Sequence, residues 1–393
     1  MQHRHAYTRR EEPHQAPVKG NNTHVITTQE QKLPQPSQLS YLRNQLSRPG
    51  VAVAVFRALY LGDMLVAIPA LRTLKRFNPD MHLTLIGLAW AREFAARYDF
   101  IDAFAAVPPL PGLHTEPVED ASAREALESL KRRFDVVIQM HGSGPQSNDV
   151  VRSLEPRASA GFFPALGTVP GGGAYIPYPE TGSEVSRSLV LVEALTGARG
   201  TDELEFPITE DDRLALDTAL QSAGGPLGRY VCVHPGAKLS SRRWPLDRFA
   251  TVAGALRDKG RRIVVTGSQA EAGLTAPIVS AIGASAVDMT GRTSLGALAA
   301  LIEGADLLVS NDTGVAHLAA AARTPSVIVS SGSDPARWAP GDTRLHRTLA
   351  HNIECRPCMY EDCPIGHPCA LGTTVAAVLA EAEDLLAVSG GGR

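Results

Sequence analysis

Short apolar runs alternate with helix-like segments through most of the chain. Three runs have the length and aliphatic composition of strands buried in a parallel sheet: residues 51–56, 81–87 and 134–139. Helical spacing of apolar residues marks the segments between or after them: 64–77, 89–98, 123–133 and 184–196. Strands that alternate with helices predict a parallel sheet with helices on both faces.

The same alternation restarts near residue 211. Strands are predicted at 230–234, 262–266, 286–288, 307–310 and 326–329. Helices are predicted at 211–223, 245–259, 274–282, 295–304, 313–322 and 373–387. The sequence therefore predicts two doubly wound α/β domains, over 49–208 and 209–393. Their ligands should lie at the carboxyl ends of the strands, in the cleft between the domains.

Residues 1–48 differ from the rest of the chain. They are rich in His, Gln, Asn and Pro and show no periodicity. Such a segment cannot offset its ordering entropy by burying apolar surface, so we predict a disordered tail. An ordered helical arm is the alternative.

The overall charge argues against several classes of partner. The 393 residues carry a formal net charge of −3, which favours neither nucleic acid nor an anionic membrane surface. No apolar run approaches the roughly 20 residues of a membrane span. Residues 1–40 lack the apolar segment of a signal peptide. We therefore expect a cytoplasmic protein whose thiols are reduced.

The first loop that carries chemistry follows the strand at 51–56. It places Asp63 at the carboxyl end of that strand, where substrates bind in such folds. Pro69 should kink the helix that comes next. The alternative role for Asp63 is a helix cap. The loop has no GxGxxG and the chain has no Walker A sequence, so neither a dinucleotide fold nor a P-loop enzyme is supported.

The second loop follows the strand at 230–234. Gly236 allows close approach of a ligand to the backbone. Lys238, Arg242 and Arg243 bring three cations into six residues, which suits an anionic ligand. A solvated basic turn is the alternative.

The third loop, Ser310 to His317, also joins a strand to a helix. The free N–H groups and dipole at a helix start favour an anion. We expect Asp312 to cap this helix while the amides of Thr313 and Gly314 bind the anion. His317 lies one turn in, and its alternative role is structural.

Together these loops resemble those of glycosyltransferase family 9, the ADP-heptose:lipopolysaccharide heptosyltransferases. The matching stretches run in family order from about residue 51 to 388. They are Gly62-Asp63-x5-Pro69-Ala70-Leu71, His234-Pro235-Gly236, Arg243-Trp244-Pro245, Thr266-Gly267-Ser268, Thr290-Gly291-Arg292-Thr293-Ser294-Leu295 and Asn311-Asp312-Thr313-Gly314-x2-His317. One departure is Arg242, where the family commonly has Lys; it keeps the charge but offers a planar fork.

The resemblance implies a GT-B fold, in which two doubly wound Rossmann-like domains face each other across a cleft. It also implies an inverting transfer of a sugar, heptose from ADP-heptose, onto a lipopolysaccharide-core or other glycan acceptor. Asp63 would be the general base. The implied donor contacts, joined by Lys238 on grounds of charge, are Gly236, Ala237, Arg242, Glu271, Thr293, Asp312, Thr313, Gly314 and His317. Peripheral contact with the inner face of the cytoplasmic membrane would bring the enzyme to its acceptor.

No Asp-x-Asp signature stands out, so we predict that transfer needs no metal ion or other cofactor. Protein cations would then stabilise the departing diphosphate. On the acceptor side, His141, Gln146 and Asn148 occupy a loop expected to face the cleft. The alternatives are a non-catalytic nucleotide-sugar-binding module and a GT-B transferase or epimerase that uses a different nucleotide-sugar.

A cysteine-rich loop at 355–369 stands apart from these motifs. Cys355, Cys358, Cys363 and Cys369 fall within fifteen residues, whereas Cys232 lies in a predicted strand and should be a buried apolar residue. Clustered thiols in a reducing compartment suggest structural zinc, reduced thiols or disulfides, and the spacing does not decide among them.

Overall fold

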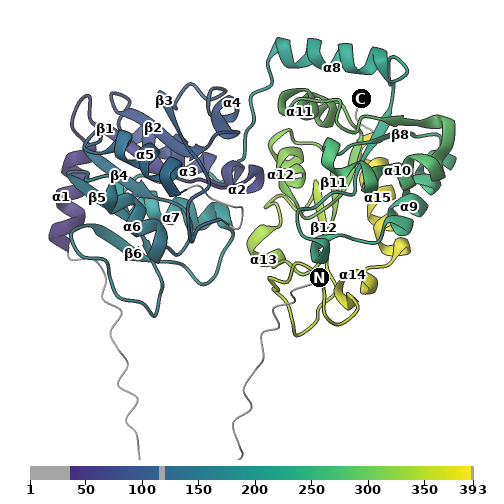
Figure 1. Ribbon diagram of the computed structural model, residues 1–393. Helices are drawn as coiled ribbons and strands as arrows, with labels where there is room; N and C mark the ends of the chain where they lie inside the picture. The colour runs from purple at the N-terminus through teal and green to yellow at the C-terminus, as the bar shows by residue number, and fades with distance from the viewer. Residues whose placement is uncertain (1–35, 115–119, 391–393) are drawn as a thin grey trace, which may run out of the picture. The chain divides into compact units, whose positions relative to one another are not determined.

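The computed structural model describes residues 36–114 and 120–390, and it contains two six-stranded parallel sheets (Figure 1). The first sheet has the order β3-β2-β1-β4-β5-β6. Its strands are β1 (Ala52–Phe56), β2 (His82–Leu88), β3 (Ala103–Val107), β4 (Val136–Gln139), β5 (Ala158–Phe163) and β6 (Ala174–Pro177).

The second sheet repeats this winding, with the order β12-β11-β10-β7-β8-β9. Its strands are β7 (Tyr230–His234), β8 (Arg262–Val265), β9 (Ala286–Asp288), β10 (Leu307–Asn311), β11 (Ser326–Val329) and β12 (His346–Leu349). In each sheet the strand order reverses between two neighbours, β1 and β4 or β7 and β10. Ligands bind at such points in open α/β sheets. The predicted pair of doubly wound halves is confirmed, and the sheets lie on either side of the predicted boundary at residue 208.

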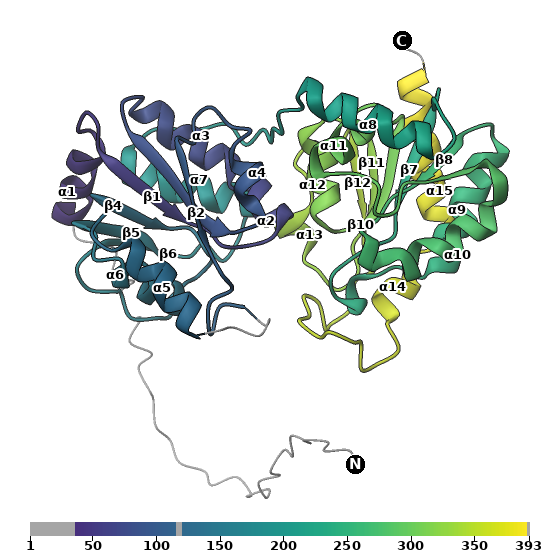
Figure 2. The same ribbon diagram turned by 45° about the horizontal axis from the view of Figure 1, so that its top comes forward.

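Alternating side chains of β1 divide the first half into two cores. Val53 and Val55 pack with α1 (Pro36–Leu46), α3 (Ile68–Phe77) and α7 (Glu184–Thr196). Ala54 and Phe56 pack with the opposite layer, α5 (Asp120–Leu130) and α6 (Pro145–Ser153). Figure 2 shows α3 and α7 on one side of this sheet and α5 and α6 on the other. The short helices α2 (Leu61–Leu65) and α4 (Ala91–Ala95) follow β1 and β2.

The second half is layered in the same way. Val231 and Val233 of β7 face α9 (Leu246–Asp258), α10 (Ala272–Ile282) and α15 (Val375–Gly390). The buried Cys232 faces the other layer, as expected of a small apolar side chain. That layer consists of α8 (Glu210–Ser222), α11 (Leu295–Glu303) and α12 (Gly314–Ala321). Two short helices, α13 (Pro335–Trp338) and α14 (Pro368–Gly372), follow β11 and β12.

The predicted tail is corrected in its last part. Pro36–Leu46 forms α1, which buries Leu42 and Leu46 against the first sheet; the rest of the tail lies outside the described residues. Only two apolar positions of α1 are buried, so packing rather than a long amphipathic pattern stabilises this helix. Among the described helices, none combines the length and apolar character needed to cross a bilayer.

Other differences have local causes. The predicted helix at 64–77 is two helices, because Pro69 lies in the first turn of α3, where a missing N–H costs little. The sequence pattern missed β3, β5, β6 and β12. Two of these, β3 and β5, are rich in Ala or contain Gly, which have low strand propensity.

Truncation of α1's buried face should weaken the whole fold. Leu46 is 0 % exposed, so Leu46→Ala should lower the free energy of unfolding by about 3 kcal/mol. Leu166→Ala is the matched control, because that leucine is 98 % exposed. Urea denaturation of both variants measures the difference. Equal midpoints for the two would contradict the packing of α1.

Candidate active site

A cavity of about 710 Å³ is lined by residues of both halves. The first half contributes Tyr60, Leu61, Gly62, Asp63 and Trp90. All eleven residues that the sequence nominates as the base or as donor contacts line this cavity. They are Asp63, Gly236, Ala237, Lys238, Arg242, Glu271, Thr293, Asp312, Thr313, Gly314 and His317. The structure thus brings together loops that are up to 254 residues apart (Asp63 to His317).

Two glycines allow α2 and α12 to approach closely. A Cβ on Gly62 would lie 3.0 Å from Cδ2 of His317, and one on Gly314 would lie 3.0 Å from the Gly62 nitrogen. Any larger residue at either position would push the helices apart. This contact carries Asp63, the next residue along α2, to the edge of the cavity.

Asp63 lies inside α2 rather than at its cap, so the capping alternative is wrong; the cap position is Tyr60. Arg57 Nε donates to the backbone oxygen of Asp63 at 2.7 Å. Within the described residues, the Asp63 carboxylate accepts no hydrogen bond. Burial raises its pKa, as does Glu184, while Arg57, His317 and Arg337 oppose the rise. A raised pKa makes the ionised carboxylate a stronger base.

One buried amide ties the loops of the second half together. Asn311, at the end of β10, donates through Nδ2 to the Pro235 oxygen at 2.7 Å. Its Oδ1 accepts from the Trp244 backbone nitrogen at 2.8 Å. The loops after β7 and β10 are therefore joined, and the sequence motifs gave no sign of this role.

The three cations of the second loop have different roles. Arg242 lines the cavity and donates through Nη2 to the Cys358 oxygen at 2.6 Å. Lys238 Nζ lies 4.0 Å from the centre of the Tyr60 ring and donates to its hydroxyl, so it joins the two halves. Arg243 is outside the cavity lining; its Nε donates to the Ala237 oxygen at 2.8 Å and supports the loop.

Asp312 does not cap α12, which corrects that expectation. Its Oδ2 accepts hydrogen bonds from the hydroxyls of Ser330 and Ser333. The cap residue is Thr313, and no side chain within the described residues caps the helix. Thr313 Oγ1 is buried and, in the same described part, has no hydrogen-bond partner. The start of α12 therefore offers unused donors to the cavity.

Gly236 makes room for Glu271. A Cβ on Gly236 would collide with Glu271 Oε1. The other oxygen, Oε2, accepts from the nitrogen and hydroxyl of Ser268, both at 2.8 Å. The absence of a side chain at Gly236 therefore leaves space for the Glu271 carboxylate in the cavity wall, as well as for any ligand in the cavity.

His317 is buried beside Asp63. Burial lowers its pKa, against the opposing effect of Asp312 and Asp63. Its ring lies 6.1 Å from the ring of Trp338, another lining residue that the sequence did not indicate.

The residues nominated for the acceptor do not line this cavity. Asn148 is buried and donates through Nδ2 to the Phe162 oxygen at 2.8 Å. Gln146 is exposed on α6. His141 Nδ1 accepts from the Ala58 nitrogen at 3.1 Å, and its ring stacks on Phe56. At least Asn148 and His141 are engaged in holding the fold.

The cysteine loop forms a cavity of its own, of about 110 Å³, lined by Cys355, Cys358, Cys363, Cys369 and other residues. All five cysteines of the chain are free thiols, so the disulfide alternative is not seen. Across the described residues, no three His, Cys, Asp or Glu side chains are arranged to hold a metal ion. The zinc hypothesis therefore gains no support.

Two doubly wound halves that share a cavity are the arrangement of the GT-B fold. The family model "Glycosyltransferase family 9 (heptosyltransferase)" matches residues 124–368. The chain therefore belongs to glycosyltransferase family 9 and is a glycosyltransferase.

Individual relatives agree with this assignment. Lipopolysaccharide heptosyltransferase 3 of Escherichia coli K12 is 24 % identical over 324 residues, which cover 77 % of this chain and 89 % of the relative. A family 9 glycosyltransferase structure from Veillonella parvula matches 86 % of this chain and 98 % of its own, with a TM-score of 0.70 and 21 % identity. E. coli heptosyltransferase WaaC with ADP-2-deoxy-2-fluoro heptose matches 85 % of this chain and 99 % of its own, with a TM-score of 0.60 and 18 % identity.

The partly buried His141 should make the fold sensitive to acid. Burial lowers its folded-state pKa to about 3, with Arg57 and His114 contributing, whereas an unfolded histidine has a pKa near 6.5. Below pH 6.5 the unfolded chain takes up a proton that the folded chain refuses, so this stability is complete above pH 6.5 and is lost as the pH falls toward 3.

Between pH 7.5 and 5.5, the free energy of unfolding of His141→Asn should therefore fall by about 1.4 kcal/mol less than that of the wild type. Urea unfolding at the two pH values measures it. His82→Asn, at an exposed position, is the control and should keep the wild-type pH dependence. An unchanged loss in His141→Asn would contradict the neutral, partly buried state of this histidine.

Proposed function

We propose that this enzyme transfers heptose from ADP-heptose to a hydroxyl of a lipopolysaccharide-core acceptor, with inversion and without a metal ion. The observation that carries the proposal is the single cavity in which Asp63 of the first half meets the donor-loop residues of the second. The names of two relatives, lipopolysaccharide heptosyltransferase 3 and WaaC with an ADP-heptose analogue, support the choice of donor and acceptor.

The donor lies against the second half. The amides at the start of α12 and the unpartnered Thr313 hydroxyl bind the diphosphate, and Arg242 and Lys238 balance its charge. Glu271 accepts hydrogen bonds from the ribose hydroxyls. One cation at about 4 Å contributes roughly 4 kcal/mol at an effective dielectric near 20, which corresponds to about a thousandfold in rate. Protein cations can thus do the work of a metal ion at the leaving group.

Asp63 removes the proton from the acceptor hydroxyl as its oxygen attacks the anomeric carbon. The bond from that carbon to the diphosphate oxygen breaks on the opposite face, and ADP leaves with the electron pair. The configuration at the anomeric carbon is therefore inverted. The raised pKa of Asp63 suits this role, since the carboxylate gains basicity from its burial.

The acceptor places the enzyme at the cytoplasmic face of the membrane that carries the glycolipid. Contact with that membrane is peripheral in this proposal. His141, Gln146 and Asn148 lie outside the shared cavity, so the acceptor is expected to meet Tyr60 and Trp90 near Asp63 instead.

Removal of the base should abolish turnover and spare donor binding. Asp63→Asn should lower kcat by roughly 10²- to 10⁴-fold, because general-base catalysis contributes on that scale. ADP release in the presence of ADP-heptose and a lipopolysaccharide-core acceptor measures turnover, and calorimetry with ADP measures binding. Asp217→Asn, at an exposed site on α8, is the control. A wild-type kcat in Asp63→Asn would rule out the proposed mechanism.

Donor preference should follow from the second half. Calorimetry should show tighter binding of ADP-heptose than of its UDP and GDP counterparts, with no change on addition of EDTA. Arg242→Gln should weaken ADP-heptose binding by about tenfold, because a charge-assisted contact to the diphosphate is lost. Equal affinity for the UDP-sugar, or binding that EDTA abolishes, would contradict the assigned donor and the absence of a metal.

A further inference from the structure

A buried ion pair joins the two halves beside Asp63. Glu184, the first residue of α7, is 6 % exposed. It accepts hydrogen bonds from Arg337 Nε at 3.0 Å and from the Tyr178 hydroxyl at 2.5 Å. Arg337 Nη2 also donates to the Tyr178 hydroxyl at 2.9 Å. Burial alone would raise the pKa of Glu184, but Arg337 and Tyr178 hold it below the usual range, so the pair is ionised.

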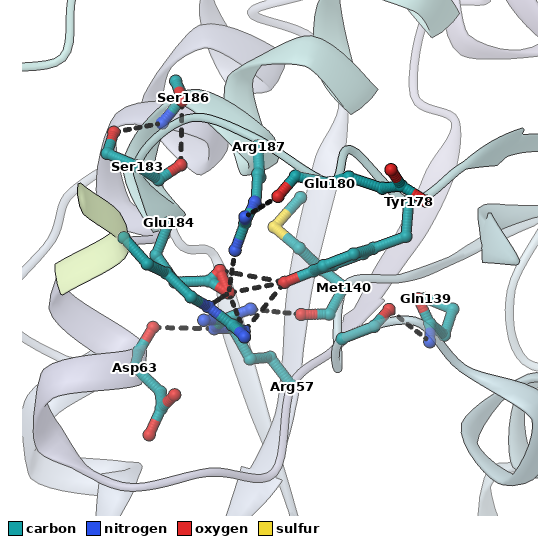
Figure 3. Close-up of polar contacts among 12 residues, drawn as sticks. Arg57, Asp63, Gln139, Met140, Tyr178, Glu180, Ser183, Glu184, Ser186 and Arg187 are labelled. Atoms are coloured by element: carbon teal, nitrogen blue, oxygen red, sulfur yellow. Dashed lines mark hydrogen bonds and ion pairs between the residues drawn. The ribbon is translucent and has the colours of Figure 1, made fainter. Parts of the chain in front are cut away.

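The same cluster reaches the backbone of Asp63. Arg57 is buried at the carboxyl end of β1, and it donates to the backbone oxygens of Asp63 and Met140. Figure 3 shows these contacts, with the Asp63 carboxylate pointing away from Arg57. Arg57 therefore fixes the position of Asp63 and leaves its carboxylate available to the cavity.

On the other side, Arg337 lies next to the shared cavity but is not among its lining residues. It lies on α13 between two lining residues, Ser333 and Trp338. Its guanidinium is 5.1 Å from the centre of the Trp338 ring. Ser333 donates to Asp312, another lining residue. A displacement of Arg337 would thus shift Trp338, which does line the cavity.

We propose that Glu184 and Arg337 are positioning residues for the transfer reaction: their ion pair fixes α13, which carries the lining residue Trp338, against the first half beside Asp63, and their opposite charges both act on Asp63 as the base. The inference rests on the proposed function, in which Asp63 is that base.

Four titratable or charged groups act on Asp63, each from a different element. They are Arg57 at the end of β1, Glu184 of α7, His317 of α12 and Arg337 of α13. Arg57 donates to two backbone oxygens, and both Arg57 and His317 favour ionisation of Asp63. Glu184 and Arg337 form an ion pair, and their effects on Asp63 have opposite sign. Glu184 opposes ionisation of Asp63, and Arg337 favours it.

A purely structural role makes a different prediction. A buried ion pair adds little net stability compared with an apolar pair, and loss of either partner leaves the other uncompensated. If the pair only held the halves together, both single variants would damage the enzyme in the same way. If it also sets the field at Asp63, the two variants must shift the pH dependence in opposite directions.

The test is the acid limb of kcat/KM against pH, which reports the essential base in the free enzyme. The assay is ADP release with ADP-heptose and a lipopolysaccharide-core acceptor. Glu184→Gln removes the negative charge, so Asp63 ionises more easily and the limb moves to lower pH. Arg337→Gln removes the positive charge, so the limb moves to higher pH. Each variant should also lose roughly tenfold in kcat through misplacement of the base and of Trp338.

Two further sets of variants make the result specific. Arg337→Lys keeps the charge but loses the planar fork, so the limb should stay in place while kcat falls. If Glu184→Gln does not fold, the comparison of Arg337→Gln with Arg337→Lys is sufficient to test whether the charge of Arg337 acts on Asp63. Arg213→Gln and Glu303→Gln break an exposed ion pair of 2.6 Å between α8 and α11 and should leave the limb unmoved.

Opposite shifts for Glu184→Gln and Arg337→Gln support the inference. Shifts in the same direction, or no shift in either, overturn it. Failure of the inference can be told from failure of the proposed function. If Asp63→Asn is inactive and the limbs do not separate, only the positioning role is wrong. If Asp63→Asn keeps the wild-type rate, the base itself is misassigned.

Discussion

Between Gly62 and Gly314 the two halves of the protein meet almost backbone to backbone. A single added methyl group at either position would press on the opposite helix or on His317. Each glycine lies in the first turn of a short helix at the cavity. Gly62 comes directly before Asp63 in α2, and Gly314 is the first residue of α12. The distance between Asp63 and the start of α12 is therefore set by the close approach of two residues that have no side chain. The rest of the site depends on this contact.

The polar network around the contact explains why a carboxylate can work there. Asp63 is held by its backbone through Arg57, so the carboxylate itself remains uncommitted. Burial raises its pKa, which suits the proposed role as a base, and the ionised pair of Glu184 and Arg337 adds charges of both signs. The site thus separates two tasks: backbone contacts determine where Asp63 lies, while burial and the surrounding charges determine how readily its carboxyl gives up a proton.

Much of the site was predictable because its chemistry lies on loops directly after apolar strands. Asp63 and Thr313 each follow such a strand, and parallel strands bring their carboxyl ends to one edge. Long-range pairing was not predictable in this way. Glu184 and Arg337 are 153 residues apart and show no shared motif, and the bridging role of Asn311 appears only once β7 and β10 are neighbours. In the fold, strands with strong aliphatic patterns were found, whereas the alanine- and glycine-containing β3 and β5 were not.

Asn311 has a consequence for how the donor loops can vary. The side-chain amide of Asn311 bonds both to the loop after β7 and to the segment before α9. Asn311 is also the last residue of β10, directly before Asp312. Three segments that differ in sequence position are thereby mechanically coupled into one platform. A change that reshapes one of them will be transmitted to the other two, so under the proposed function altered donor selectivity in this scaffold requires coordinated rather than single substitutions.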